Sequence, residues 1–241
     1  MLLLIGLLIG GQPASSDAQQ RGSPRSSSLD KKPSQRATDR LDPLRDRTIK
    51  LGEKQWQLLD RTSERALQYL ATTQGRDGSF DAPQLGQPGI TSLCALAYLS
   101  RGIGTDDPNY GQRLHRGIDY VIKTQKPDGL FTLLLPGPRF QSEGPSHAAL
   151  YNHAMAGYFL CEVYGMMQPD DNQRIGEAIN KALSLSREYQ IQHKGSQIDR
   201  GGWKYLRHSP HTSHDSDVLV TTWQLKFLAS SPESVGKIRF G

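Results

Sequence analysis

Apolar residues recur at helical spacing in six segments of the chain, and two kinds of segment alternate. One kind carries a single apolar stripe, and it occupies residues 59–70, 114–122 and 175–183. The other kind is apolar on most faces, as in helices buried on every side, and it occupies residues 90–99, 148–163 and 218–228. No segment of useful length shows the two-residue period of a strand. The pattern predicts an all-α fold with striped outer helices over buried inner ones.

The striped segments end in a repeated turn. RALQYLATTQGRDGSF at 65–80 and RGIDYVIKTQKPDGLF at 116–131 share their internal spacing, with nine residues from the basic residue to Gln and six from Gln to the aromatic. A third copy runs from Lys181 to Gln190 over the same nine residues, but an insertion delays its aromatic to Trp203. The first residues of successive copies are 51 and 65 positions apart, within or just above the range of helical-hairpin repeats.

The first 47 residues do not resemble core material. Residues 1–9 form an apolar run too short to span a membrane, and Ser16-Asp17-Ala18 after it offers a small-x-small cleavage pattern. We therefore expect a signal peptide at 1–18 and export to the periplasm or the cell exterior; an uncleaved anchor is the alternative. Residues 19–47 are polar and predict a disordered basic linker. The helical domain is expected at 48–230, followed by a tail at 231–241.

Charge and cysteine content narrow the classes of function. The net charge is +5, and residues 19–47 carry eight Lys or Arg against four Asp, so the folded part is close to neutral. A basic low-complexity segment is usually a solvated linker, and nucleic acid is therefore not expected as a partner. Cys94 and Cys161 both lie in apolar segments. They are expected to be small buried side chains, although a pair between them remains open.

The repeated basic residue, small residue, Gln, Gly and aromatic resemble the QW repeat of squalene-hopene cyclases and the related repeats of protein prenyltransferase β subunits. The segments HAALYNHAMAGYFLCEVYGM and DSDVLVTTWQLKFLAS also look like squalene-cyclase-like bacterial repeat proteins. The resemblance covers residues 59–230 and implies an α/α toroid. It also implies that the repeat residues are structural clamps, in which a Gln side chain caps backbone groups beside an aromatic. These residues are Gln74, Phe80, Gln125, Phe131, Gln190 and Trp203.

Squalene-hopene cyclases protonate an alkene with a DxDD motif, and this chain offers Asp215-Ser216-Asp217-Val218. The last acid of the motif is absent in this register. Asp215 and Asp217 are the candidate catalytic acids. The competing interpretation is that they cap the helix that follows, where the positive helix end favours a charged carboxylate and a proton donor must be neutral.

Prenyltransferases bind zinc with a D-x-C pair, and Asp215-x-Asp217 lacks the thiolate. His208, His211 and His214 lie near these carboxylates, but a histidine-bearing loop is usually only a loop, so we expect no metal and no cofactor. Inner-helix residues could instead line a central cavity, with ordinary packing as the alternative. The cavity candidates are Tyr151, His153, Tyr158 and Trp223.

The resemblance implies a protein that acts on or binds a terpenoid or another hydrophobic ligand. Two other classes stay open: a non-catalytic repeat scaffold for a protein partner, and a carbohydrate-active barrel enzyme with paired carboxylates among Glu143, Glu162 and Asp217. Three hairpins make about half of the six that the implied toroid has. We therefore expect self-association, a partner, or further sequence to complete the ring.

Overall fold

The computed structural model describes residues 51–137, 143–207 and 214–231, and every regular element among them is helical. The α-helices are α2 (Glu53–Thr73), α3 (Gly89–Leu99), α4 (Gly111–Lys123), α5 (Glu143–Val163), α6 (Pro169–Ile191) and α7 (Val218–Ser230). Two 3₁₀ turns, η1 (Gln84–Gly86) and η2 (Gln197–Asp199), lie in the connections. The prediction of an all-α fold with six helices is confirmed. The expected signal peptide, the basic linker and all but Ser231 of the expected tail lie outside the described residues.

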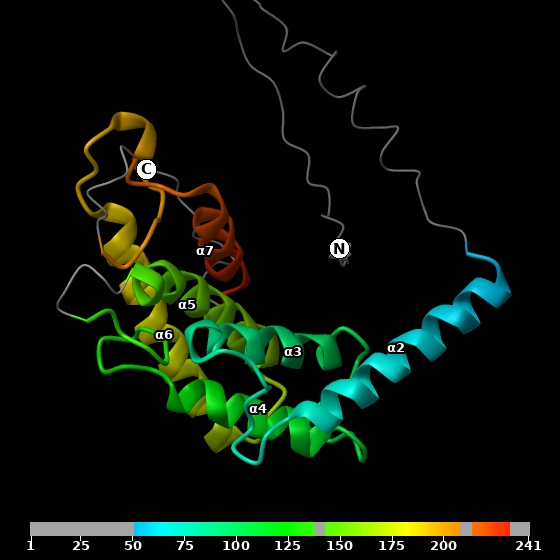
Figure 1. The fold of residues 1–241 in the computed structure, drawn as a ribbon. Helices are drawn as coiled ribbons and strands as arrows, with labels where there is room; N and C mark the ends of the chain where they lie inside the picture. Colours follow the sequence, from blue (N-terminus) through cyan, green and yellow to red (C-terminus); the bar gives the residue numbers. More distant parts are fainter. Residues whose placement is uncertain (1–50, 138–142, 208–213, 232–241) are drawn as a thin grey trace, which may run out of the picture. The chain divides into compact units, whose positions relative to one another are not determined.

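Helices α3, α5 and α7 form a row, in which α5 packs against both of the others (Figure 1). Helix α4 packs on α3, and α6 packs on α5. The apolar stripes of α4 and α6 face this row: Leu114, Ile118 and Val121 of α4 are at most 1% exposed. Because the row is covered by an outer helix and by its own members, α3 has no exposed side chain. The core therefore lies between two layers of helices.

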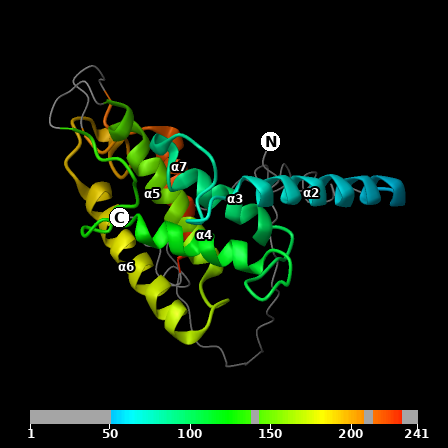
Figure 2. The same ribbon diagram turned by 60° about the horizontal axis from the view of Figure 1, so that its bottom comes forward.

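Helix α2 differs from the other striped helices. The apolar spacing predicts a buried face along residues 59–70, yet Leu67 is the only buried residue of α2 and Leu59 is 40% exposed. Figure 2 shows the N-terminal half of α2 projecting away from the other helices. An outer helix buries its stripe against the preceding repeat, and no described element lies on that side of α2. The apolar stripe of α2 therefore has no described helix packed against most of its length.

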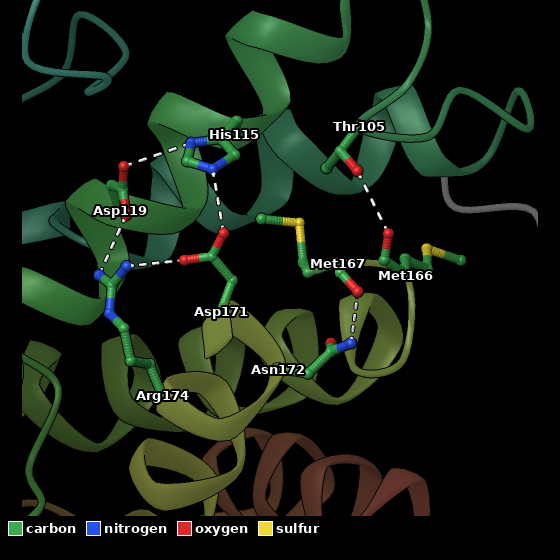
Figure 3. Close-up of polar contacts among 8 residues, drawn as sticks. All are labelled: Thr105, His115, Asp119, Met166, Met167, Asp171, Asn172 and Arg174. Carbon is green, nitrogen blue, oxygen red and sulfur yellow. Dashed lines mark hydrogen bonds and ion pairs between the residues drawn. The ribbon is translucent and has the colours of Figure 1, made fainter. Parts of the chain in front are cut away.

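A network of ion pairs joins α4 to the first turns of α6 (Figure 3). Arg174 contacts Asp119 at 3.1 Å and Asp171 at 2.9 Å, and the His115 ring lies 3.3 Å from Asp119 and 3.6 Å from Asp171. All four side chains are partly exposed, with relative accessibilities of 28–48%. Exposed pairs of this kind contribute little stability each, so the network mainly fixes how α6 starts beside α4.

The two cysteines are free thiols in partly buried positions on α3 and α5. Burial raises the pKa of both, and that of Cys161 to about 12. Both thiols are therefore small packing groups in the described structure, with low reactivity at neutral pH. None of the described helices is long and apolar enough to cross a membrane.

Candidate functional site

The turn after α2 joins this helix to α4 through one side-chain amide. Gln74 Nε2 donates to the carbonyl of Gly78 in its own turn at 3.0 Å and to the carbonyl of Arg113 in α4 at 2.9 Å. Gln74 also pairs with Phe80 in an isolated antiparallel bridge, which closes the turn. The amide thus satisfies a carbonyl on each side and ties one outer helix to the next.

The turn after α4 repeats this arrangement. Gln125 Nε2 donates to the carbonyl of Gly129 at 3.1 Å and to the carbonyl of Ala178 in α6 at 2.8 Å, and Gln125 forms a bridge with Phe131. In the third turn, Gln190 Nε2 lies 3.5 Å from the carbonyl of Gly201. The first bond is therefore present in all three turns, and the bond to a following outer helix in two.

In each of the first two turns, a glycine packs closely against the next outer helix. Gly78 has φ = 92°, and a Cβ added there would lie 2.1 Å from the carbonyl oxygen of Arg116. Gly129 has φ = 96°, and its added Cβ would lie 2.5 Å from the carbonyl oxygen of Lys181. Both the left-handed backbone and the close approach require glycine at these two positions.

The aromatic residue of each turn is held by the inner helix that follows it. The backbone N–H groups of Phe80, Phe131 and Trp203 donate to one side chain each, at 3.0, 3.2 and 3.0 Å. The acceptors are Thr91 Oγ1, His153 Nδ1 and Thr221 Oγ1. Each acceptor binds the aromatic residue of the turn before its own helix, so the three define equivalent positions in α3, α5 and α7. All three aromatic rings are at most 3% exposed.

His153 lies between the two layers and is fully buried. Its Nε2 lies 3.2 Å from the carbonyl oxygen of Ala182 and 3.0 Å from Ser186 Oγ. Desolvation lowers the pKa of His153 from its usual 6.5 to about 4, so the ring is neutral at physiological pH. Both ring nitrogens have partners in the core, which are the contacts of a packing residue; a role in a cavity stays a prediction.

Asp217 is the N-cap of α7. Its Oδ1 accepts hydrogen bonds from the backbone N–H groups of Leu219 and Val220, both at 2.9 Å, and from the hydroxyl of Tyr151 at 3.2 Å. Burial, together with the charge and hydrogen bond of Asp217, raises the pKa of Tyr151 to about 12. The capping interpretation of Asp217 is thus confirmed.

Asp215 does not cap the helix. Its Oδ2 accepts a hydrogen bond at 2.8 Å from the backbone N–H of Gly195, in the connection after α6. Its own N–H donates to Asp199 Oδ2 at 3.0 Å. Asp215 therefore fastens the chain before α7 to the connection that follows α6.

Asp199 is a third carboxylate of this region, and the repeat spacing gave no signal for it. It is 2% exposed, and it accepts a short bond of 2.5 Å from Ser216 Oγ. That bond, with the one from the Asp215 N–H, lowers the pKa of Asp199. The first two turns have Asp77 and Asp128 directly before the glycine, but the insertion in the third copy moves the acid to one residue earlier. A buried ionised acid with these donors organises the loop.

An open groove of about 460 Å³ lies at the end of the third hairpin, beside Asp199 and Asp217. Its lining includes Asp199, Gly201, Ser216, Asp217 and Thr221. His214 also lines it; His208 and His211 lie outside the described residues. No cluster of three or more potential metal ligands occurs in the part of the chain that the structure describes.

Two of the predicted cavity residues share one cation. Lys226 Nζ of α7 lies 4.4 Å from the ring centroid of Tyr158 in α5 and 5.6 Å from that of Trp223. Both rings are partly exposed. Their faces are already in contact with a positive charge, whereas Tyr151 is directed toward Asp217 and His153 lies in the core. The structure therefore separates the four cavity candidates into different surroundings.

Compared with models of protein families and with curated proteins, the sequence matches none. Assignment of a function to these residues depends on their geometry.

Proposed function

We propose that this protein is an exported α/α-toroid repeat protein of the squalene-cyclase-like type that works as a non-catalytic binding scaffold. The toroid is supported by the row of α3, α5 and α7, by the outer helices packed on it, and by turns that tie each outer helix to the next. Such repeats present extended surfaces on which partners dock. Export is supported by the apolar run at residues 1–9.

One observation carries the choice of scaffold over cyclase: Asp217 Oδ1 accepts three hydrogen bonds. An acid that starts a cationic cascade must present a proton to the alkene, whereas this oxygen is engaged by two backbone N–H groups and the Tyr151 hydroxyl. Lys226 adds to this, because its ammonium group lies over Tyr158 and Trp223. A positive charge at these rings disfavours a carbocation there.

The test is incubation of the purified protein with squalene and with shorter polyprenyl substrates, followed by product analysis. We expect no turnover from the wild type. Asp217→Asn is the matched variant, because asparagine also caps helices well and so keeps α7 intact. Turnover by the wild type that disappears in Asp217→Asn would contradict the scaffold proposal and favour the cyclase.

A second candidate function is the binding of an apolar ligand that carries an acidic group. The aromatic rings of Tyr158 and Trp223 offer apolar contact area, and Lys226 offers the charge. Titration of tryptophan fluorescence with a long-chain fatty acid, and with a neutral hydrocarbon as the comparison, tests it. The acid should bind more tightly than the hydrocarbon, and Lys226→Gln should remove that preference.

Export has its own test. N-terminal sequencing of the protein from its native host should find a mature chain that starts near Gln19, and an intact Met1 in the cytosol would refute export.

A further inference from the structure

Two surfaces, one on the first described hairpin and one on the last, lack the packing that their counterparts have in the other repeats. We call the first the tail surface: Gln190, Gly201, Val218, Thr222 and Leu225. The second, the head surface, lies on α2: Leu59, Thr62, Arg65, Ala66 and Tyr69. Within the chain, a turn and the inner helix after it pack on the next outer helix twice, at α4 and at α6. By repeat alignment, the tail surface corresponds to the turn side of this contact and the head surface to the outer-helix side.

The third turn has the shape of the first two without their contact to a following helix. Gly201 has φ = 76°, like Gly78 and Gly129, but a Cβ added to Gly201 would meet nothing within 4 Å. Among the described residues, the amide of Gln190 is bonded only within its own turn, whereas those of Gln74 and Gln125 also reach the next outer helix. The turn is formed and its acceptor helix is absent from this part of the chain.

Helix α7 is exposed at positions that are buried in α3 and α5. The acceptors Thr91, His153 and Thr221 align the inner helices, so that Val218 corresponds to Leu150 and Leu225 to Ala95. Val218 is 78% exposed, whereas Leu150 is 1% exposed.

Leu225 is 40% exposed, whereas Ala95 is 1% exposed. Thr222 is also exposed, and its counterparts Ser92 and Ala154 are fully buried. In α3 and α5 these positions are covered by the following hairpin.

Helix α2 has a small residue, Ala66, at a position where no described segment packs closely enough to exclude a larger side chain. Ala66 is aligned with Gly117 of α4 and Ala182 of α6. A Cβ on Gly117 would lie 3.7 Å from Gln74 Nε2 and 4.0 Å from the carbonyl oxygen of Gly78, so a small side chain leaves room for the preceding turn. Gly117 and Ala182 are buried and Ala66 is exposed.

The apolar positions beside Ala66 behave in the same way. Leu59 is 40% exposed, and its counterpart Ile175 is fully buried. Tyr69 is 68% exposed, and its counterpart Leu185 is 7% exposed. The head surface therefore has the side chains of an outer-helix contact face without the contact.

We propose that the tail surface of one copy docks on the head surface of a second copy of this chain, in the way that the first two turns dock on α4 and α6. Gln190 of one copy then donates to the carbonyl of Thr62 in the other, the counterpart of Arg113 and Ala178. Gly201 packs against the carbonyl of Arg65, the counterpart of Arg116 and Lys181. The occupant is a second copy because one chain carries both halves of the contact in matching register.

This proposal rests on the proposed toroid scaffold and names its partner. The contact joins two different surfaces, so it closes into a ring only if the rotation per subunit allows it. Three hairpins from each copy give the six of the implied toroid. We therefore expect a closed dimer held by two identical contacts.

The experiment uses the full chain and measures molar mass by light scattering over a wide range of concentration. The wild type should be a dimer. Ala66→Trp should be a monomer, because the indole occupies the place of the docking turn. Gly201→Asn should also be a monomer, since asparagine tolerates a positive φ and places a side chain in the contact. Gln57→Trp is the control and should remain a dimer, because Gln57 is exposed and, nine residues before Ala66, lies on the opposite face of α2.

Mixing the two monomeric variants makes the test specific. Ala66→Trp keeps its tail surface and Gly201→Asn keeps its head surface, so an equimolar mixture should form a heterodimer through one intact contact. Circular dichroism of each variant should match the wild type, because both positions are exposed within one copy. Longer head-to-tail oligomers of the wild type that Ala66→Trp abolishes would also support the contact.

A wild type that is monomeric at every concentration would overturn the proposal, and so would a dimer that neither variant affects. These outcomes are independent of the turnover assay. A monomer without turnover refutes the docking alone, and a dimer with turnover refutes the scaffold function alone.

Discussion

Replacement of Gly129 by alanine tests whether the turn-to-helix contact holds the repeats together. Gly129 has φ = 96°, and the added Cβ would lie 2.5 Å from the Lys181 carbonyl oxygen. Gly165 offers a matched control, because its φ is 90° and a Cβ added there would meet nothing within 4 Å. The two substitutions share the backbone strain and differ in the contact.

The left-handed conformation costs an alanine about 1–2 kcal/mol, and this cost applies to both variants. A methyl group forced into a well-packed contact costs about 1–3 kcal/mol more. The backbone of α6 cannot move away without weakening the hydrogen bond from Gln125 to Ala178, which is worth about 1 kcal/mol. We therefore expect Gly129→Ala to lower the free energy of unfolding by about 1–4 kcal/mol more than Gly165→Ala does.

Urea denaturation followed by circular dichroism measures both variants against the wild type, at one protein concentration so that any association is held constant. Equal losses in the two variants would refute the reasoning, because the contact with Lys181 would then contribute nothing. A larger loss in Gly165→Ala would refute it as well.

Two further predictions concern buried and capping groups. The pKa of His153 is about 4 in the folded chain, below its usual value of 6.5. Between these pH values the unfolded chain binds more protons than the folded chain does. The free energy of unfolding therefore decreases as the pH falls from 6.5 to 4. At about 1.4 kcal/mol per pKa unit the loss is about 3 kcal/mol. His153→Gln should reduce this pH dependence in urea denaturation. An unchanged dependence in this variant would show that the ring is not the source. Asp217→Ala removes the acceptor of the Leu219 and Val220 N–H groups and should cost about 0.5–2 kcal/mol, whereas Asp217→Asn should cost much less; equal costs would exclude the cap as the cause.

The helices could be predicted because each depends on local spacing. The stripe of α4 and the nearly uniform apolarity of α3 specify a helix and the faces that are suited to burial. The repeat of Gln, Gly and aromatic was visible for the same reason, since the two close copies have identical spacing. The acidic pair before α7 was also visible, and the choice of Asp217 as the cap follows from where the helix begins.

The burial of α2 and the role of Asp199 could not be predicted in this way. The apolar stripe of α2 has the same spacing as that of α4. Burial of the stripe also requires a neighbouring element, and the spacing of apolar residues does not indicate whether that neighbour is present. Asp199 lies in an insertion, where the repeat register is lost, and its partners Asp215 and Ser216 are brought to it by the path of the connection between α6 and α7.

The sequence by itself determined the all-α class, the six helices and the position of the repeated turns, because these depend on residues within a few positions of one another. Only the tertiary structure decided which carbonyls the Gln amides reach, that His153 takes the place of Thr91 and Thr221, and that Ala66 and Gly201 are left without the contacts of their counterparts. These are relations between segments tens of residues apart, and they are fixed by the packing of one hairpin on the next.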